Sequence, residues 1–349
     1  MAISGAVRDH GFHPLRVARV VPETAESASF VLDVPEELRD AYAYEAGQFL
    51  TFRVPVDGEH HLRSYSMSSS PAVDAELQVT VKRVPGGLVS NAMIDTLGPG
   101  DVVEATRPAG VFCLGPGDAD VVAFAAGSGI TPVFSLLKAA LAGSSRQVRL
   151  LYANRDRESV IFRDALDALV EQHPERLAVV HRLDVEHGFV DDVSVAAFAD
   201  GAAGSDVFVC GPTPFMDIVE GALLDRAVDP GRIHIERFDP APPPAPAEEA
   251  PASDGPTKVT IELDGRTGTI DHHPGTTILQ TAREMGMAAP FSCEAGNCAT
   301  CMARVLDGAV TMYTNNALTD DEVADGWVLT CQSVPTTPTV HVVYGYGEA

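Results

Sequence analysis

The sequence predicts a multidomain protein with an antiparallel β-barrel, an α/β domain built on a parallel sheet, and a small α+β domain. Three observations lead to this fold class. A chain of 349 residues is too long for one compact core. The pattern of apolar residues changes near residue 115, and a segment with seven prolines in eighteen residues, 239–256, interrupts the chain later. We therefore expect domains at 10–115, 116–238 and 257–349.

The first domain, residues 10–115, contains short β-type runs. The runs at 49–56, 77–84 and 102–108 are separated by glycine and proline turns. Short strands divided in this way are typical of an antiparallel barrel or sandwich.

The second domain, residues 116–238, alternates apolar strands with helical patterns. Such alternation is typical of a parallel sheet covered by helices. The expected strands are 121–127, 148–155, 177–183 and 207–212, and the expected helices are 132–143, 162–172 and 215–228.

The segment 239–256 is a Pro/Ala-rich linker, because such a composition cannot pack a core and favours extended chain. After it, 258–265 and 267–271 alternate like the strands of a hairpin with a turn at Asp264–Gly265. Residues 275–287 have the pattern of an amphipathic helix that stops at Gly286. The third domain therefore combines strands with a helix.

The composition excludes several kinds of partner. Against 49 acidic residues there are 24 basic ones, a net charge of −25, which disfavours nucleic acid. No apolar run is as long as a membrane helix, and the first residues lack the apolar core of a secretion signal. We expect a cytoplasmic protein with no membrane partner, reduced cysteines and, by preference, a monomeric state.

A glycine-rich turn follows the first strand of the α/β domain. Gly127 and Gly129 would let the backbone approach a phosphate, and Pro132 suits the first turn of the helix that follows. By itself this pattern also fits an ordinary tight turn. Further along, Gly211 and Pro212 end another strand at the edge where open α/β sheets bind ligands.

A second candidate site lies in the β-rich domain at 62–71. Arg63 can neutralise a phosphate, Tyr65 can stack on a planar ring, and Ser66 can hydrogen-bond a ring nitrogen. The same residues also fit a plain surface strand. The turn at 86–93 adds a second glycine- and serine-bearing site for a phosphate.

Four cysteines near the C-terminus form a ligand set. Cys293, Cys298 and Cys301 are spaced C-x₄-C-x₂-C, and Cys331 follows after 29 residues, which is the plant-type spacing for a [2Fe–2S] cluster. Zinc sites present two C-x₂-C pairs instead, and a reducing compartment disfavours disulfides. Of the other cysteines, Cys113 is expected in a core and Cys210 beside a cofactor.

Together these motifs resemble the ferredoxin–NADP reductase superfamily over residues 10–238. The resemblance implies FAD in the barrel and a nicotinamide nucleotide in the α/β domain. Its motifs are R-x-Y-S at 63–66, G-x-G-x-T-P at 127–132, C-G-P at 210–212 and E-x-F at 236–238.

The resemblance also implies roles for single residues. Arg63 would lie on the FAD pyrophosphate, Tyr65 against the isoalloxazine ring, and Ser66 near its N5 atom. Ser66, Thr131 and Glu236 are the expected catalytic residues. Further residues of the FAD site would be Ser64, Val81, Gly87 and Ser90. Around the nicotinamide nucleotide would lie Gly127, Gly129, Thr131, Pro132, Cys210, Gly211, Pro212, Glu236 and Phe238.

Residues 257–349 resemble plant-type ferredoxins, which implies a β-grasp fold. The domain order resembles the reductase components of multicomponent oxygenases. Within them it is most similar to the reductases of bacterial 3-ketosteroid 9α-hydroxylases, and next to those of phenylacetyl-CoA epoxidases. Electrons would pass from NADH to FAD to the cluster, because FAD accepts two electrons together and releases them singly. The acceptor would be a terminal oxygenase, by preference a Rieske non-haem iron oxygenase.

Two alternatives stay open. The chain could serve a di-iron epoxidase or another monooxygenase with NADPH, or it could be a redox-sensing or electron-storing protein. The loop after the second α/β strand bears on the nucleotide. Arg155 and Arg157 suit the 2′-phosphate of NADPH, whereas Asp156 and Glu158 repel it and favour the free ribose of NADH. We expect NADH, although these charges also fit a solvated loop.

Overall fold

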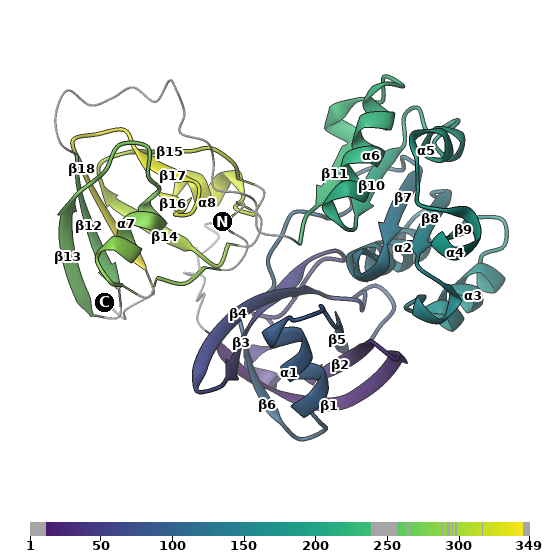
Figure 1. Cartoon of the computed structure of the whole chain (residues 1–349), viewed down its shortest axis with the longest axis horizontal. Coiled ribbons are helices and arrows are strands. Elements are labelled where there is room, and N and C mark those ends of the chain that lie inside the picture. Colours follow the sequence, from purple (N-terminus) through teal and green to yellow (C-terminus); the bar gives the residue numbers. More distant parts are fainter. Residues whose placement is uncertain are drawn as a thin grey trace, which may run out of the picture.

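The computed structural model describes residues 12–238, 257–263, 265–287, 289–291, 294, 296, 299–315 and 317–344. Its strands form three large sheets and one two-stranded sheet, each confined to one part of the chain (Figure 1). The predicted linker 239–256 lies outside the described residues, as do Asp264, Cys293 and Cys298.

The first sheet is antiparallel and has the strand order β4-β3-β6-β1-β2-β5. Beyond the end of β4, a bridge pairs Met67 with Val79, and the Ser68 N–H donates to the Gln78 carbonyl at 2.8 Å, which links β4 to β5 and closes the barrel. The strands are β1 (His13–Thr24), β2 (Ser27–Asp33), β3 (Phe49–Val56), β4 (Glu59–Ser66), β5 (Leu77–Lys82) and β6 (Val102–Ala105). A 3₁₀ turn (Glu36–Leu38) and helix α1 (Leu88–Thr96) lie between strands.

The second sheet is parallel, in the order β11-β10-β7-β8-β9. Its strands are β7 (Val121–Ala126), β8 (Val148–Asn154), β9 (Leu177–Leu183), β10 (Asp206–Cys210) and β11 (Ile233–Glu236). Its helices are α2 (Ile130–Gly143), α3 (Arg163–Gln172), α4 (Asp184–His187), α5 (Asp192–Phe198) and α6 (Thr213–Leu224). Short 3₁₀ turns span Gly127–Gly129, Arg157–Ser159 and Pro230–Arg232.

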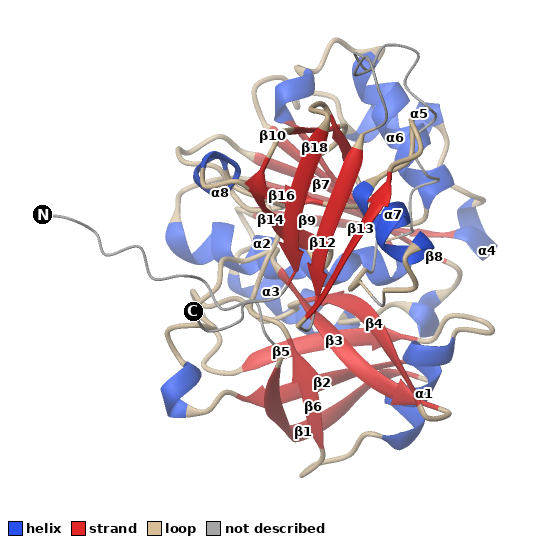
Figure 2. Cartoon of the chain, turned by 90° about the vertical axis from the view of Figure 1, so that its left-hand side faces the viewer, coloured by secondary structure: helices blue, strands red, loops and turns tan. Residues whose placement is uncertain are grey.

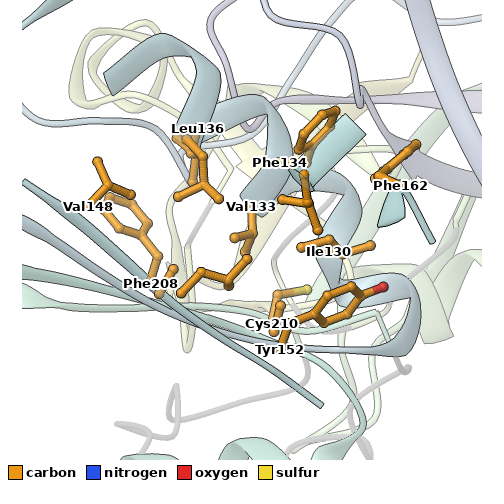
Figure 3. Close-up of a cluster of buried hydrophobic side chains, with 14 of the residues drawn as sticks. Ile130, Val133, Phe134, Leu136, Val148, Tyr152, Phe162, Phe208 and Cys210 are labelled. Carbon is orange, nitrogen blue, oxygen red and sulfur yellow. The ribbon is translucent and has the colours of Figure 1, made fainter. Parts of the chain in front are cut away.

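Both faces of this parallel sheet are buried, which explains why its central strand is apolar throughout. Along β7, Ala123 and Ala125 pack in the core under α2 and α3, whereas Val122 and Phe124 pack against α5 and α6. Figure 3 shows the first of these cores, with side chains of α2 lying over the sheet.

The strand order places a topological switch point at the end of β7. β8 lies on one side of β7 and β10 on the other, so the chain leaves the two neighbouring strands β7 and β10 in opposite directions. In open α/β sheets, ligands bind at such a point, outside the carboxyl ends of the strands. The two glycine-bearing turns follow β7 and β10 and therefore meet there.

The third sheet is mixed, in the order β13-β12-β18-β14-β16, with β12 and β18 parallel. Thr277 caps α7 through a reciprocal pair of hydrogen bonds with Gln280. The strands are β12 (Lys258–Leu263), β13 (Arg266–Asp271), β14 (Met302–Asp307), β15 (Val310–Met312), β16 (Trp327–Leu329), β17 (Ser333–Pro335) and β18 (Thr339–Tyr344); the helices are α7 (Ile278–Glu284) and α8 (Asp320–Ala324).

The predicted fold class is confirmed: an antiparallel barrel, a parallel α/β domain and a mixed-sheet domain follow one another. Strands predicted at 49–56 and 177–183 have the expected limits, and the helix at 132–143 begins two residues earlier, at Ile130. Figures 1 and 2 show the mixed sheet beside the β3–β4 side of the barrel. Within the described residues, none of the helices has the length and apolar character needed to cross a bilayer.

Candidate functional site

The two glycine turns at the switch point touch each other. A Cβ atom added at Gly129 would lie 2.7 Å from the Gly211 nitrogen and even closer to the Cys210 carbonyl oxygen. Only glycine fits there, because a side chain would push the ends of β7 and β10 apart. Gly127 has φ +53°, in the left-handed region that glycine adopts without strain.

Hydrogen bonds hold the first of these turns in place. The Thr131 hydroxyl donates to the Ser128 carbonyl at 3.0 Å, and the buried Tyr152 hydroxyl donates to the Gly127 carbonyl at 3.1 Å. Pro132 is buried in the first turn of α2, as predicted. The 3₁₀ turn Gly127–Gly129 runs directly into α2, and the Ile130 N–H donates to the Gly127 and Ser128 carbonyls. The amino end of this helical stretch therefore lies at the glycine turn itself, a position that suits a pyrophosphate.

Sequence reasoning missed Lys82, the last residue of β5. Its ammonium nitrogen would lie 3.3 Å from a Cβ atom placed at Gly127, so a barrel strand brings a cation to the glycine turn of the other domain. The signal in the sequence was a lysine at the end of a strand in which apolar residues alternate with polar ones. A cation at this point complements the helix N-terminus for an anionic ligand.

Cys210 and Glu236 are neighbours at this edge of the sheet, because β10 and β11 pair them in register. Burial, with the Glu236 carboxylate as a further cause, raises the pKa of the Cys210 thiol well above its usual value. Burial also raises the pKa of Cys113 to about 12, and Glu45 and Glu236 add to the effect. Both thiols are therefore neutral at pH 7 and poor nucleophiles. Phe238 is partly exposed just beyond β11.

The candidate FAD residues lie on β4. Arg63 is exposed and donates to the Leu62 carbonyl at 2.7 Å, which leaves other guanidinium N–H groups for a ligand. The Tyr65 ring lies 5.9 Å from that of Phe52, and burial raises the pKa of its hydroxyl. Ser66 is 2% exposed, and its hydroxyl has no hydrogen-bond partner among the described residues. An orphaned buried hydroxyl fits a flavin ring that would supply the partner.

Other residues expected in the FAD site have structural contacts that the sequence did not predict. The Val81 side chain is fully buried in the barrel core, so only its backbone could face a ligand. Gly87 caps α1, and a Cβ there would lie 2.9 Å from the Ser90 hydroxyl. That hydroxyl accepts a hydrogen bond from the Val84 N–H at 3.1 Å and so shapes the turn. Ser64 lies next to Arg63, and its hydroxyl pairs with that of Thr51 at 2.9 Å.

The charged loop after β8 is more ordered than its composition suggests. The Asp156 carboxylate accepts from the Ser159 N–H at 2.9 Å and from Arg155 Nε at 2.8 Å. The hydrogen bond from Arg155 is the main reason that the pKa of Asp156 is lowered. Arg155 also reaches Glu26, in the β1–β2 turn of the barrel, at 3.9 Å. These charges therefore hold the loop in place.

The two described cysteines of the predicted ligand set lie in the core of the mixed-sheet domain. Cys301 and Cys331 are 2% and 4% exposed. The Cys301 carbonyl accepts from the hydroxyl of Thr330, the residue before Cys331, at 2.7 Å. Burial is the main cause of the raised pKa of Tyr344, and both thiols add to it, so the two cysteines lie near one hydroxyl. Two buried thiols that both act on one hydroxyl are compatible with ligands of a common cluster.

In comparisons with known proteins, each of the three large sheets lies in a part of the chain that matches a known domain family. Residues 14–113 match the oxidoreductase FAD-binding domain, residues 124–221 the oxidoreductase NAD-binding domain, and residues 261–336 the 2Fe-2S iron-sulfur cluster binding domain. The predicted cofactors, FAD, NAD(P)H and a [2Fe–2S] cluster, are thereby confirmed.

Two curated relatives match nearly the whole chain. The ferredoxin reductase component of the 3-ketosteroid-9-alpha-monooxygenase of Rhodococcus rhodochrous is 41% identical, with 95% of this chain and 96% of the relative covered. One of the subunits of the 1,2-phenylacetyl-CoA epoxidase of Escherichia coli K12 is 35% identical, with 95% and 97% covered.

Two solved structures are similar as well. Phthalate dioxygenase reductase has a TM-score of 0.57 and 27% identity, with 96% of this chain and 98% of that chain covered. An intact type IV self-sufficient cytochrome P450 monooxygenase has a TM-score of 0.67 and 26% identity, and this chain spans 41% of its length. The chain therefore belongs to the ferredoxin–NADP reductase family, in the group of oxidoreductases that join an FAD-binding and an NAD-binding domain to a C-terminal 2Fe-2S ferredoxin domain.

Proposed function

We propose that the chain is the NADH-dependent reductase component of an oxygenase and passes electrons from NADH through FAD and a [2Fe–2S] cluster to a Rieske oxygenase. The observation that carries this proposal is that the two candidate sites lie next to each other. The Gly127 turn and its α2 N-terminus lie beside Lys82 of the barrel, on the strand that neighbours the orphaned Ser66.

When bound, FAD accepts the two electrons of a hydride and releases them singly, as a one-electron cluster requires. The chain's own residues hold and shield this chemistry. Arg63 would neutralise the FAD pyrophosphate, and Tyr65 would cover a face of the ring. The Ser66 hydroxyl would donate to the ring nitrogen that receives the hydride. Thr131 and Glu236, with the neutral thiol of Cys210, would position the nicotinamide and exclude water from it.

The cluster would be held by Cys293, Cys298, Cys301 and Cys331. The buried pair Cys301 and Cys331 supports this assignment, and the hydrogen bond from Thr330 to Cys301 fixes the spacing of two of the ligands. Arg283 forms a bidentate pair with Glu294 at 2.9 Å, in the loop between the first two cysteines. This pair would order that loop around the cluster.

The acceptor is inferred from the relatives. The 41% identity with a 3-ketosteroid monooxygenase reductase supports a steroid oxygenase over the epoxidase suggested at 35%. A redox sensor would not need the NAD-binding domain that residues 124–221 match.

An anaerobic titration with NADH tests the function. We expect the flavin absorbance to fall and a rhombic signal of the reduced cluster to appear in electron paramagnetic resonance. Addition of an oxygenase encoded beside this chain should then reoxidise the cluster while substrate is hydroxylated. Failure of NADH to reduce both groups would contradict the proposal.

The nucleotide preference is a separate prediction. The carboxylates of Asp156 and Glu158 in the loop after β8 would repel the roughly −2 charge of a 2′-phosphate. We expect kcat/KM with ferricyanide as acceptor to be at least tenfold higher for NADH than for NADPH, a difference of about 1.4 kcal/mol. A tenfold preference for NADPH would instead favour the epoxidase-type alternative.

A further inference from the structure

Thr51 is buried although it points away from the barrel interior. On β3 its neighbours Leu50 and Phe52 belong to the barrel core, so Thr51 faces the opposite side. An outward residue on a barrel strand is normally exposed, yet Thr51 is 1% exposed. Part of its cover comes from the ferredoxin domain, which Figure 2 shows lying over β3 and β4.

A chain of hydroxyl groups crosses from one domain to the other at this point. The Thr51 hydroxyl lies 2.9 Å from the Ser64 hydroxyl on β4 and 3.1 Å from that of Thr300 in the ferredoxin domain. Each outer residue is joined covalently to a candidate cofactor residue. Ser64 precedes Tyr65 of the FAD site, and Thr300 precedes Cys301 of the cluster site.

Both ends of the contact are held rigidly. The Thr51 N–H donates to the Thr106 hydroxyl at 3.1 Å, and the Thr51 carbonyl accepts from the Thr106 N–H at 2.9 Å. On the other side, the Met302 N–H donates to the Ala299 carbonyl at 3.0 Å and closes a tight turn around Thr300. Two fixed surfaces that meet through a hydroxyl define one relative position of the loop and the barrel.

We propose that Thr51 is a positioning residue, which holds the Thr300–Cys301 end of the cluster site on the outer face of the barrel. The proposal deepens the proposed function, since it rests on electrons passing from FAD to the cluster. The step moves single electrons: the reduced flavin is oxidised, the cluster is reduced, and the hydroxyl chain transfers no atom. A neutral hydrogen bond makes this contact weak enough to open when an acceptor binds.

Thr51→Val tests this contact, because valine keeps the branched shape and removes the hydroxyl. In the holoprotein we expect hydrogen exchange at 299–303 to become about fivefold faster, the effect of losing about 1 kcal/mol. Flavin reduction by NADH should keep its rate, whereas the cluster should be reduced more slowly in stopped-flow absorbance. Thr51→Ser should restore both values. The control is Thr269→Val, which removes a similar Thr–Thr contact of 2.8 Å with Thr260 inside the ferredoxin domain.

The proposal would be overturned if Thr51→Val changed neither rate, with hydrogen exchange at 299–303 and cluster reduction both within twofold of the unsubstituted protein. That result would leave the proposed function intact. If NADH did not reduce the cluster at all, the proposed function itself would be contradicted. If Thr51→Val loses FAD or does not fold, Thr300→Val tests the same contact from the other domain. In the Thr300→Val variant, the hydrogen-exchange rate at β3 should rise about fivefold. An unchanged exchange rate at β3 would equally overturn the proposal.

Discussion

Ser66 illustrates how single residues in this protein are prepared for cofactors. Its hydroxyl is buried and unpaired among the described residues, a costly state in a protein without ligands. Arg63, three residues earlier, is exposed and uses only part of its guanidinium for the chain itself. Both observations are consistent with a site that a bound flavin completes.

The first prediction at this scale concerns Arg63. Arg63→Ala should weaken FAD binding by about 1.5–3 kcal/mol, roughly tenfold or more in Kd, because a pyrophosphate charge loses its partner. Tyr65→Ala should cost about 1 kcal/mol through lost stacking. The measurement is the flavin retained after dialysis. Arg16→Ala is a matched control, since Arg16 is an exposed barrel arginine paired with Asp33. Full retention in both site variants would contradict the FAD assignment.

A second residue-scale prediction concerns the cluster. Cys301→Ser should abolish or strongly destabilise the cluster while FAD stays bound, because the ligands and the flavin lie in different domains. Iron analysis and the visible spectrum measure this, with about two irons per chain expected before the change. Cys113→Ser is the control and should retain its iron. Stoichiometric zinc without sulfide in the unsubstituted protein would contradict the iron–sulfur assignment.

At the scale of elements, the decisive contact is that between the ends of β7 and β10. Gly129 at the start of α2 packs directly on the backbone of Cys210 and Gly211. The contact between these two turns would form one wall of the candidate nucleotide site. Helix α2 then covers the sheet with an almost entirely buried face, which fixes the direction of its N-terminus (Figure 3).

Gly129→Ala tests this arrangement. The added methyl group would overlap backbone atoms that cannot move singly, so we expect a loss of about 1–3 kcal/mol in the free energy of unfolding and a higher KM for NADH. Thermal unfolding and steady-state kinetics measure the two effects. Gly143→Ala, at the other end of α2, is the control because no atom lies within 4 Å of its added Cβ. Equal stability of the two variants would show that the turns are not in close contact.

The molecule as a whole has a large negative net charge and is built from separate domains. The chain has 49 acidic and 24 basic residues, a net charge of −25. A field of this sign attracts basic acceptor proteins and repels small anions. The three sheets share no strands, so the acidic ferredoxin domain is a distinct unit that rests on the barrel near Thr51.

Ionic strength should therefore change electron delivery. We expect the NADH-dependent reduction of cytochrome c, a basic protein, to slow about tenfold between roughly 10 and 150 mM salt, as the Debye length shrinks from about 30 to about 8 Å. The reduction of ferricyanide, a small anion, should not slow. Initial rates at saturating NADH measure both. A cytochrome c rate that does not respond to salt would mean that the net charge does not steer acceptors.

The fold class and the three cofactors could be predicted from the sequence, because glycine spacing, cysteine spacing and strand–helix alternation are local patterns. The same patterns predicted the limits of β3 and β9 and, within two residues, the start of α2. The other features depend on tertiary packing. Lys82 reaches Gly127 because β5 ends beside β7, Val81 turns into the barrel core, and Asp156 is drawn into a helix cap. Thr51 meets Thr300 across 249 positions. Such contacts depend on how distant elements pack, and no local pattern of residues encodes them.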